Sequence, residues 1–283
     1  KRSGAAFASF EAGVGARHDA TAVLEGVVAV AITPIAPDHL ETLGPGLREI
    51  AQDKSAALRR GVPGAAAEQS PVVLEVLEAE AQERGSQLHI DTQGDLLFTL
   101  PAGLASTEDP VRARNQRLAA ATLRLLGNVP EPAISLGLAI PPLPGRGERF
   151  LVGEIEVLLD GAHDPAAGRA LVERAGREYV LLFGSLRRKQ GEGTLRSLEV
   201  RARRVFVTSA GGELPTVTGS SDRTVIAEPR EALLAALAAS PPGGLLLIGG
   251  SLYLAGELRP LLRDLQAKVN ASGTIGEGFL EDR

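Results

Sequence analysis

The chain has 283 residues, enough for about two domains of ordinary size. Its 30 Lys and Arg against 35 Asp and Glu give a net charge of −5, whereas nucleic-acid-binding domains are usually strongly basic. Apolar residues make up 44% of the chain, so a folded core is expected, and no apolar run approaches the roughly 20 residues of a membrane span. The absence of cysteine excludes disulfides, thiolate metal sites and cysteine nucleophiles.

The first half of the chain predicts a mixture of strands and helices. A continuous apolar run ending before Thr33-Pro34 is typical of a buried strand, and helical spacing of apolar residues recurs further on. Gly85 and Gly127 are placed as helix stops. The expected elements are a strand at 27–32, one or two strands within 87–100 with a turn at 93–95, and helices at 47–58, 72–84 and 115–126.

Prolines and glycines concentrate in residues 128–147, which marks a linker and domain boundary. We therefore place one domain at 1–140 and another at 149–283, joined by a linker at 141–148.

The second half alternates cleanly between strand and helix. This alternation predicts a mostly parallel, doubly wound sheet, in which ligands bind beyond the carboxyl ends of the strands. The expected strands are 155–159, 179–183, 204–208, 225–227 and 245–248, and the expected helices are 165–175, 193–198, 229–239 and 255–267.

Two polar segments of the first half are candidates for chemistry. Residues 10–21 carry a carboxylate, a Gly-x-Gly turn, then Arg and Asp, which could hold a metal and a polar ligand or form a plain loop with solvated charges. His39 follows a strand end and could serve a phosphate-bound divalent cation, although a lone histidine is more often structural. Lys54 lies one helix further on, where a lysine is normally a solvated surface charge.

Two more candidates lie in the second half. Arg146 has the planar fork that suits phosphate, Asp160 at a strand end could hold a ribose hydroxyl, and His163 precedes a helix N-terminus that favours anions. The alternative is an Asp-Gly turn with a helix cap. Gly250-Ser251 forms either an anion-binding nest or an ordinary turn. Zinc-ligand spacing, a Gly-x-Ser-x-Gly elbow and a Gly-x-x-x-x-Gly-Lys-Ser/Thr phosphate loop are absent from the sequence.

Taken in order, these segments resemble the folylpolyglutamate synthase/dihydrofolate synthase family, a branch of the Mur-ligase-like amide ligases. The resemblance runs from about Phe7 to Leu262. The matching motifs are Glu11-x-Gly-x-Gly through Arg17-x-Asp19-Ala20-Thr21, Asp38-His39-x-x-x-Leu43-Gly44 to Lys54, Leu159-Asp160-Gly161-Ala162-His163, and Gly250-Ser251-Leu252-Tyr253-Leu254-Ala255-Gly256-Glu257.

The resemblance implies an α/β fold: the C-terminal part of a Mur-ligase-like ATPase domain in 1–140, then a Rossmann-like doubly wound glutamate-ligase domain in 149–283. It implies a cytoplasmic, monomeric enzyme of folate metabolism, without nucleic-acid or membrane partners, that uses ATP and Mg²⁺. The enzyme would phosphorylate a dihydropteroate or reduced-folate carboxylate, and the amine of L-glutamate would attack the acyl phosphate. The alternatives are a degenerate, non-catalytic binding protein and a Mur-type peptide ligase with another acceptor.

The resemblance also implies site residues. Glu11 and His39 match magnesium ligands, and Lys54 matches a lysine that is carbamylated in the family. The remaining matches are Arg146 and Asp160 for ATP, His18, Asp19 and Ala20 for the pterin, and His163 and Ser251 near the glutamate or the transferred phosphate.

The chain also departs from the family pattern. The family's phosphate loop should precede Glu11, and it is absent. Ala22 and Asp164 stand where the family has Asn, and the adenine-contacting Asn is missing near Leu118-Ala119. Since the chain also has no methionine, we expect N-terminal sequence to be missing and ATP hydrolysis by this chain alone to be poor.

Overall fold

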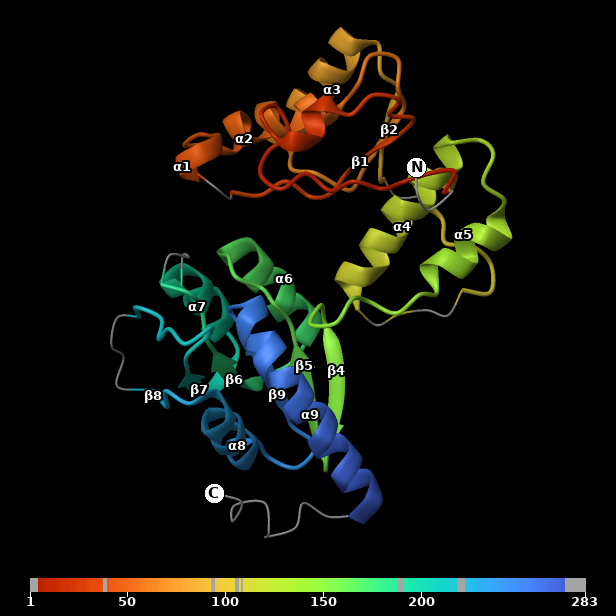
Figure 1. Ribbon diagram of the computed structural model, residues 1–283. Coiled ribbons are helices and arrows are strands. Elements are labelled where there is room, and N and C mark those ends of the chain that lie inside the picture. Colours follow the sequence, from red (N-terminus) through yellow and green to blue (C-terminus); the bar gives the residue numbers. More distant parts are fainter. Residues whose placement is uncertain are drawn as a thin grey trace. The chain divides into compact units, whose positions relative to one another are not determined.

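The computed structural model describes residues 5–37, 40–92, 95–104, 107, 109–187, 191–217 and 222–272. The chain divides into two compact units, Lys1–Ile140 and Pro141–Arg283, which are described separately below (Figure 1). Among the described helices, none is long and apolar enough to cross a membrane.

The first unit is built on a small parallel sheet. Its strands lie in the order β1-β2-β3, and both pairings are parallel. Helices α2 and α3 pack their apolar side chains on one face, and α4 covers the other. The strands are β1 (Val30–Ile32), β2 (Gly64–Ala66) and β3 (Leu88–Ile90), and the helices are α1 (Leu40–Leu43), α2 (Leu47–Lys54), α3 (Pro71–Arg84), α4 (Pro110–Leu125) and α5 (Glu131–Leu138).

Short 3₁₀ turns connect several of these elements: η1 (Ala20–Val23), η2 (Ser55–Ala57) and η3 (Leu96–Phe98). Both ends of helix α3 are set by residues that favour a helix terminus. It begins with Pro71, whose missing N–H costs nothing in the first turn, and it ends at Gly85, whose φ of 60° is in the left-handed region.

The second unit is a six-stranded sheet in the order β4-β5-β9-β6-β7-β8. All its pairings are parallel except that of the edge strand β4 with β5. Its strands are β4 (Glu148–Val152), β5 (Ile155–Leu159), β6 (Tyr179–Phe183), β7 (Ala202–Val207), β8 (Arg223–Val225) and β9 (Leu245–Gly249).

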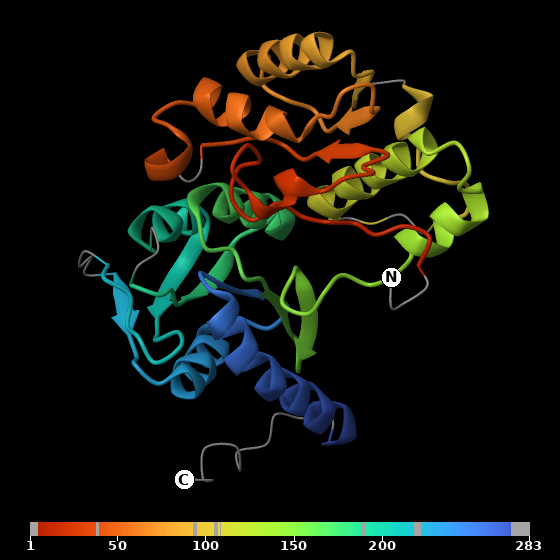
Figure 2. The same cartoon turned by 45° about the horizontal axis from the view of Figure 1, so that its top comes forward.

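Helices cover both faces of this sheet (Figures 1 and 2). One core packs α6 and α7 against the sheet, and a second packs α8 and α9 against the opposite face. Strands β6 and β9 are buried along their whole length, as expected for central strands covered on both faces. The helices are α6 (Pro165–Ala175), α7 (Gly191–Glu199), α8 (Pro229–Ala239) and α9 (Leu252–Ser272).

The sequence predictions for the second half are confirmed: a doubly wound sheet, with α6, α8, β5 and β6 at the expected residues. The rest of the chain departs from the predictions in two places. Helix α5 lies in the Pro- and Gly-rich stretch 128–147, before the linker placed at 141–148, and the helix predicted at 47–58 ends at Lys54. Of the one or two strands expected within 87–100, the described residues form one, β3, and the region after residue 95 forms η3. Two strands were missed: β2, whose Gly-Ala-Ala sequence lacks β-branched residues, and the edge strand β4.

Candidate functional site

The carboxyl ends of the central strands in the second unit bring three polar turns together. Beyond β5, the Asp160 N–H donates to Ile248 O of β9 at 3.0 Å, and beyond β6 the Gly184 N–H donates to Gly249 O at 3.2 Å. These bonds extend the parallel ladders into the loops. The sheet edge at which a doubly wound fold binds ligands therefore carries the turns that begin at Asp160, Gly184 and Gly250.

Asp160 is the buried acid of this edge, with 7% of its surface exposed. One carboxylate oxygen accepts from the Ala162 N–H at 2.9 Å and the other from Arg174 Nη1 of α6 at 2.7 Å. Burial raises the pKa of Asp160, against the opposing effects of Arg174, the Gly147 and Ala162 N–H groups and the Arg146 charge. The carboxylate thus holds the loop in place before any ligand arrives.

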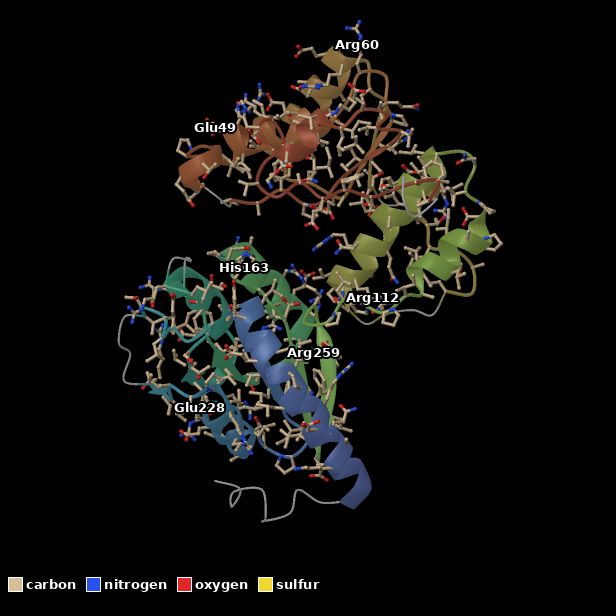
Figure 3. All side chains as sticks on the ribbon, viewed as in Figure 1. Glu49, Arg60, Arg112, His163, Glu228 and Arg259 are labelled. Carbon is tan, nitrogen blue, oxygen red and sulfur yellow. The ribbon has the colours of Figure 1, made fainter. Side chains whose placement is uncertain are left out.

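Arg146 lies on a turn that is fixed from two sides. The Gly145 N–H donates to Glu148 Oε2 at 2.9 Å, and Gly145 O accepts from the Gly161 N–H at 2.9 Å. Arg259 of α9, which is labelled in Figure 3, pairs with Glu148 at 2.7 Å. The turn therefore joins the Asp160 loop to α9, while the Arg146 side chain is exposed to solvent.

His163 closes the Asp160 loop at the start of α6 (Figure 3). Its Nδ1 lies 3.1 Å from Gly161 O. Because a carbonyl oxygen only accepts, Nδ1 carries the hydrogen in this contact, and in the neutral tautomer with that hydrogen Nε2 has the free lone pair. Ser251, 4% exposed, accepts from the Tyr253 N–H at 3.0 Å at the start of α9, which leaves its own hydroxyl hydrogen to donate.

Asp19 organises the glycine-rich loop of the first unit. Its carboxylate accepts from the N–H groups of Gly13, Val14 and Thr21 at 2.8, 3.2 and 2.9 Å and from the Thr21 hydroxyl at 2.7 Å. These bonds, led by the Thr21 hydroxyl, lower the pKa of Asp19 from 3.8 to about 2. Asp19 is therefore an ionised anchor of the loop.

The same loop is docked on the end of α2. Asp53 Oδ1 accepts from the Ala16 N–H at 2.7 Å. Gly15 has a φ of 66°, and a Cβ there would lie 2.0 Å from Asp53 Oδ1, so only glycine fits. This contact brings residues 13–19 to the helix that ends in Lys54, which is half-buried.

The other predicted residues of the first unit are less defined by contacts. Glu11, His18 and Ala20 are exposed. His39 lies outside the described residues, and among the described ones there is no group of three or more His, Asp or Glu side chains that could hold a metal. The magnesium assignment of Glu11 and His39 therefore stays a prediction, as do the ligand roles of the other site residues.

Sequence reasoning missed the supporting residues of the site: Asp53, Glu148 and Arg174. Arg174 lies near the end of an amphipathic helix, where an arginine looks like a solvated charge, and its partner is fourteen residues away. Asp53 is adjacent to Lys54, so the motif contained it, but nothing local showed that it bonds to a loop 37 residues earlier.

Comparison with known proteins gives similarities across most of the chain, although no protein-family model matches. The chain is 27% identical to the dihydrofolate synthase/folylpolyglutamate synthase of Bacillus subtilis over 91% of this chain and 67% of that protein. With the Escherichia coli protein of the same name it is 34% identical over 65% of this chain and 47% of the relative. The chain thus spans between about half and two thirds of these relatives.

Solved structures of folylpolyglutamate synthases are also similar to this chain. Folylpolyglutamate synthase of Mycobacterium tuberculosis, complexed with ADP and AMPPCP, is 25% identical with a TM-score of 0.73, covering 89% of this chain and 67% of that one. A bifunctional folylpolyglutamate synthase/dihydrofolate synthase of Yersinia pestis, complexed with AMPPNP and a manganese ion, is 25% identical with a TM-score of 0.72, covering 88% and 65%.

Proposed function

The chain belongs to the folylpolyglutamate synthase/dihydrofolate synthase family. On that premise we propose that it forms the greater part of an ATP-dependent ligase, which joins L-glutamate to dihydropteroate or a reduced folate. In this proposal residues 1–140 are part of the central ATPase domain, 141–148 the linker, and 149–283 the glutamate-ligase domain. From the family resemblance alone, we extend the proposal to a monomeric enzyme of cytoplasmic folate metabolism.

The observation that carries the proposal is the loop from Asp160 to His163 at the carboxyl edge of the second sheet. Asp160 is buried and held in one orientation by Arg174, and His163 presents Nε2. A neutral Nε2 can take the proton that the glutamate ammonium must lose before its nitrogen attacks an acyl group. Arg146, on its fixed turn, supplies a cation suited to phosphate oxygens.

The fit of the implied cofactors differs between the two units. ATP would be held in the second unit by Arg146 and by the Asp160 loop, which the structure preorganises. ATP would supply the phosphoryl group that activates the acceptor carboxylate. For magnesium, the described residues of the first unit do not form a ligand set, so we assign the metal no step.

The direct test is turnover of the complete reading frame, measured as ADP release that depends on both L-glutamate and either dihydropteroate or tetrahydrofolate. We expect Lys54→Ala and His39→Ala each to abolish most activity with little effect on folding. Arg60→Ala, an exposed site in the same unit (Figure 3), is the matched control and should keep normal activity. A complete, folded protein without ligase activity would exclude the proposal, and near-normal rates in both variants would exclude the metal-site assignment.

A second candidate function is a non-catalytic binding protein derived from this family. Leu118, near which the family's adenine-contacting Asn is missing, is buried in the core of the first unit with Phe98. Asp164, in place of Asn, caps α6 by accepting from the Ala167 N–H at 2.8 Å. Calorimetry with ATP and Mg²⁺ separates the two: tight, magnesium-dependent binding of ATP contradicts the second candidate.

A further inference from the structure

We propose that Ser185 Oγ and the N-terminal N–H groups of α7 bind a carboxylate of the amino-acid substrate, L-glutamate. The proposal rests on the ligase function above and assigns a recognition site within it. Its basis is a fully buried hydroxyl that has no hydrogen-bond partner among the described residues and that lies against the start of a helix.

Ser185 follows β6 at the carboxyl edge of the sheet and has none of its surface exposed. A buried hydroxyl without a partner costs free energy, so such a group in a native fold indicates a missing ligand or a functional role. A Cβ built on Gly191, the first residue of α7, would lie 2.6 Å from Ser185 Oγ. The hydroxyl therefore points at the N-terminus of this nine-residue helix.

The first turn of α7 has the properties of an anion site. N–H groups in the first turn of a helix have no acceptor within the helix, and the helix dipole favours negative charge there. Two of the first three residues, Gly191 and Gly193, have no side chain to cover these N–H groups. A carboxylate has acceptors for both the N–H groups and the Ser185 hydroxyl.

The site lies beside the candidate catalytic loop. A Cβ on Gly193 would come within 3.3 Å of Pro165 Cγ, the first residue of α6, and His163 is two residues before that proline. The starts of α6 and α7 are therefore neighbours. A glutamate whose carboxylate sits at α7 can place its amine toward His163 Nε2.

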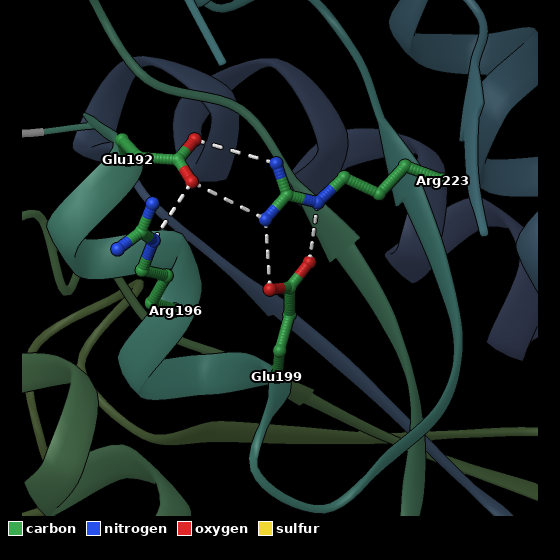
Figure 4. A network of polar contacts seen from close by, with 4 residues as sticks. All are labelled: Glu192, Arg196, Glu199 and Arg223. Carbon is green, nitrogen blue, oxygen red and sulfur yellow. Dashed lines mark hydrogen bonds and ion pairs between the residues drawn. The ribbon is translucent and has the colours of Figure 1, made fainter. Parts of the chain in front are cut away.

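The one acidic side chain in the first turn of α7 is directed elsewhere and neutralised. Glu192 pairs with Arg196 on α7 at 3.0 Å and with Arg223 on β8 at 3.3 Å (Figure 4). Arg223 also pairs with Glu199 at 2.6 Å, so among the four side chains drawn each carboxylate contacts at least one guanidinium group. Glu192 therefore does not repel an anion at the helix start.

The test is titration of the full chain with L-glutamate, without nucleotide, followed by amide NMR shifts of the second unit. Ser185→Ala should weaken glutamate binding about tenfold or more, the usual effect of losing a hydrogen bond to a charged group. The variant should stay as stable as the wild type, because the hydroxyl it removes has no partner. Gly191→Ala, whose Cβ would displace the hydroxyl, should also weaken binding.

Ser240→Ala is the matched control, because it removes a buried serine hydroxyl that bonds Ala236 O at 2.9 Å on α8. It should leave glutamate affinity unchanged. Equal affinities of wild type and Ser185→Ala, or no glutamate-dependent shifts at α7, overturn the proposal. Neither result depends on ATP, whereas absence of turnover with intact glutamate binding at α7 would count against the ligase function alone.

Discussion

Replacing Arg174 with Met should show how much the buried ion pair of Arg174 with Asp160 contributes to the free energy of unfolding. Arg174 and Asp160 are among the least exposed ion-pair partners in the second unit, with 12% and 10% of their side-chain surfaces exposed. Methionine keeps much of the arginine's apolar stem but removes the charge. The Asp160 carboxylate would then be buried with only backbone N–H donors.

The expected loss of unfolding free energy is about 3 kcal/mol at neutral pH. Removing one partner of a buried pair typically costs about 3–5 kcal/mol, and the lower end applies because the Ala162 and Gly147 N–H groups still bond the carboxylate. Adding Asp160→Asn to Arg174→Met removes the unpaired charge and should recover a large part of this loss.

The stability loss caused by Arg174→Met should depend on pH, in a direction that follows from the pKa of Asp160. Burial already raises the folded-state pKa of Asp160, and loss of Arg174 raises it further. A carboxyl group whose pKa is raised on folding binds more protons in the folded state, so its destabilising effect is full above the folded pKa and shrinks as pH falls toward the unfolded value. The deficit of Arg174→Met should therefore be largest at neutral pH and smaller at mildly acidic pH.

Tyrosine fluorescence during urea unfolding is a selective probe. The chain has no tryptophan, and its two tyrosines, Tyr179 and Tyr253, both lie in the second unit. Arg196→Met, at a side chain that is 70% exposed, is the control and should cost no more than about 0.5 kcal/mol. A loss below about 1 kcal/mol in Arg174→Met, or one independent of pH, would refute the reasoning.

Three further predictions concern the glycine-rich loop and α7. Gly15→Ala should destabilise the first unit by about 2–3 kcal/mol, measured by far-UV CD during unfolding. The control Gly61→Ala should cost about 1 kcal/mol, because Gly61 has a similar φ but no atom within 4 Å of an added Cβ. Equal losses in the two variants would contradict the docking of the glycine-rich loop on Asp53. Asp19→Asn should speed amide exchange at Gly13 and Val14. Because the folded pKa of Asp19 is lowered, that difference should be full above pH 3.8 and fade toward about 2; a constant difference would refute the anchor role. Arg223→Met should lower the stability of the second unit by about 1–3 kcal/mol in the tyrosine fluorescence assay. The Arg223 side chain is 8% exposed, and its loss removes the cation that Glu192 and Glu199 share. An unchanged midpoint of the unfolding transition would refute this prediction.

The sequence by itself determined the parts of this protein that depend on short-range patterns. Apolar runs and helical spacing located β5, β6, α6 and α8, because each reports on the burial of one face of one element. Gly85 located the C-terminal end of α3 for the same local reason. The motifs around Asp160 and Ser251 indicated the family, since a loop that must approach a ligand closely tolerates few residue types.

Only the tertiary structure decided which polar groups come together at the carboxyl edge of the second sheet. Strand β9 lies between β5 and β6, far from both in sequence, and this order brings the turns at Asp160, Gly184 and Gly250 to one edge. The pairing of Asp160 with Arg174 and the burial of the Ser185 hydroxyl against Gly191 follow from helix packing on that sheet. Local sequence patterns specify an element and its buried face, whereas the partner across the interface depends on strand order and packing, which no short window of the sequence contains.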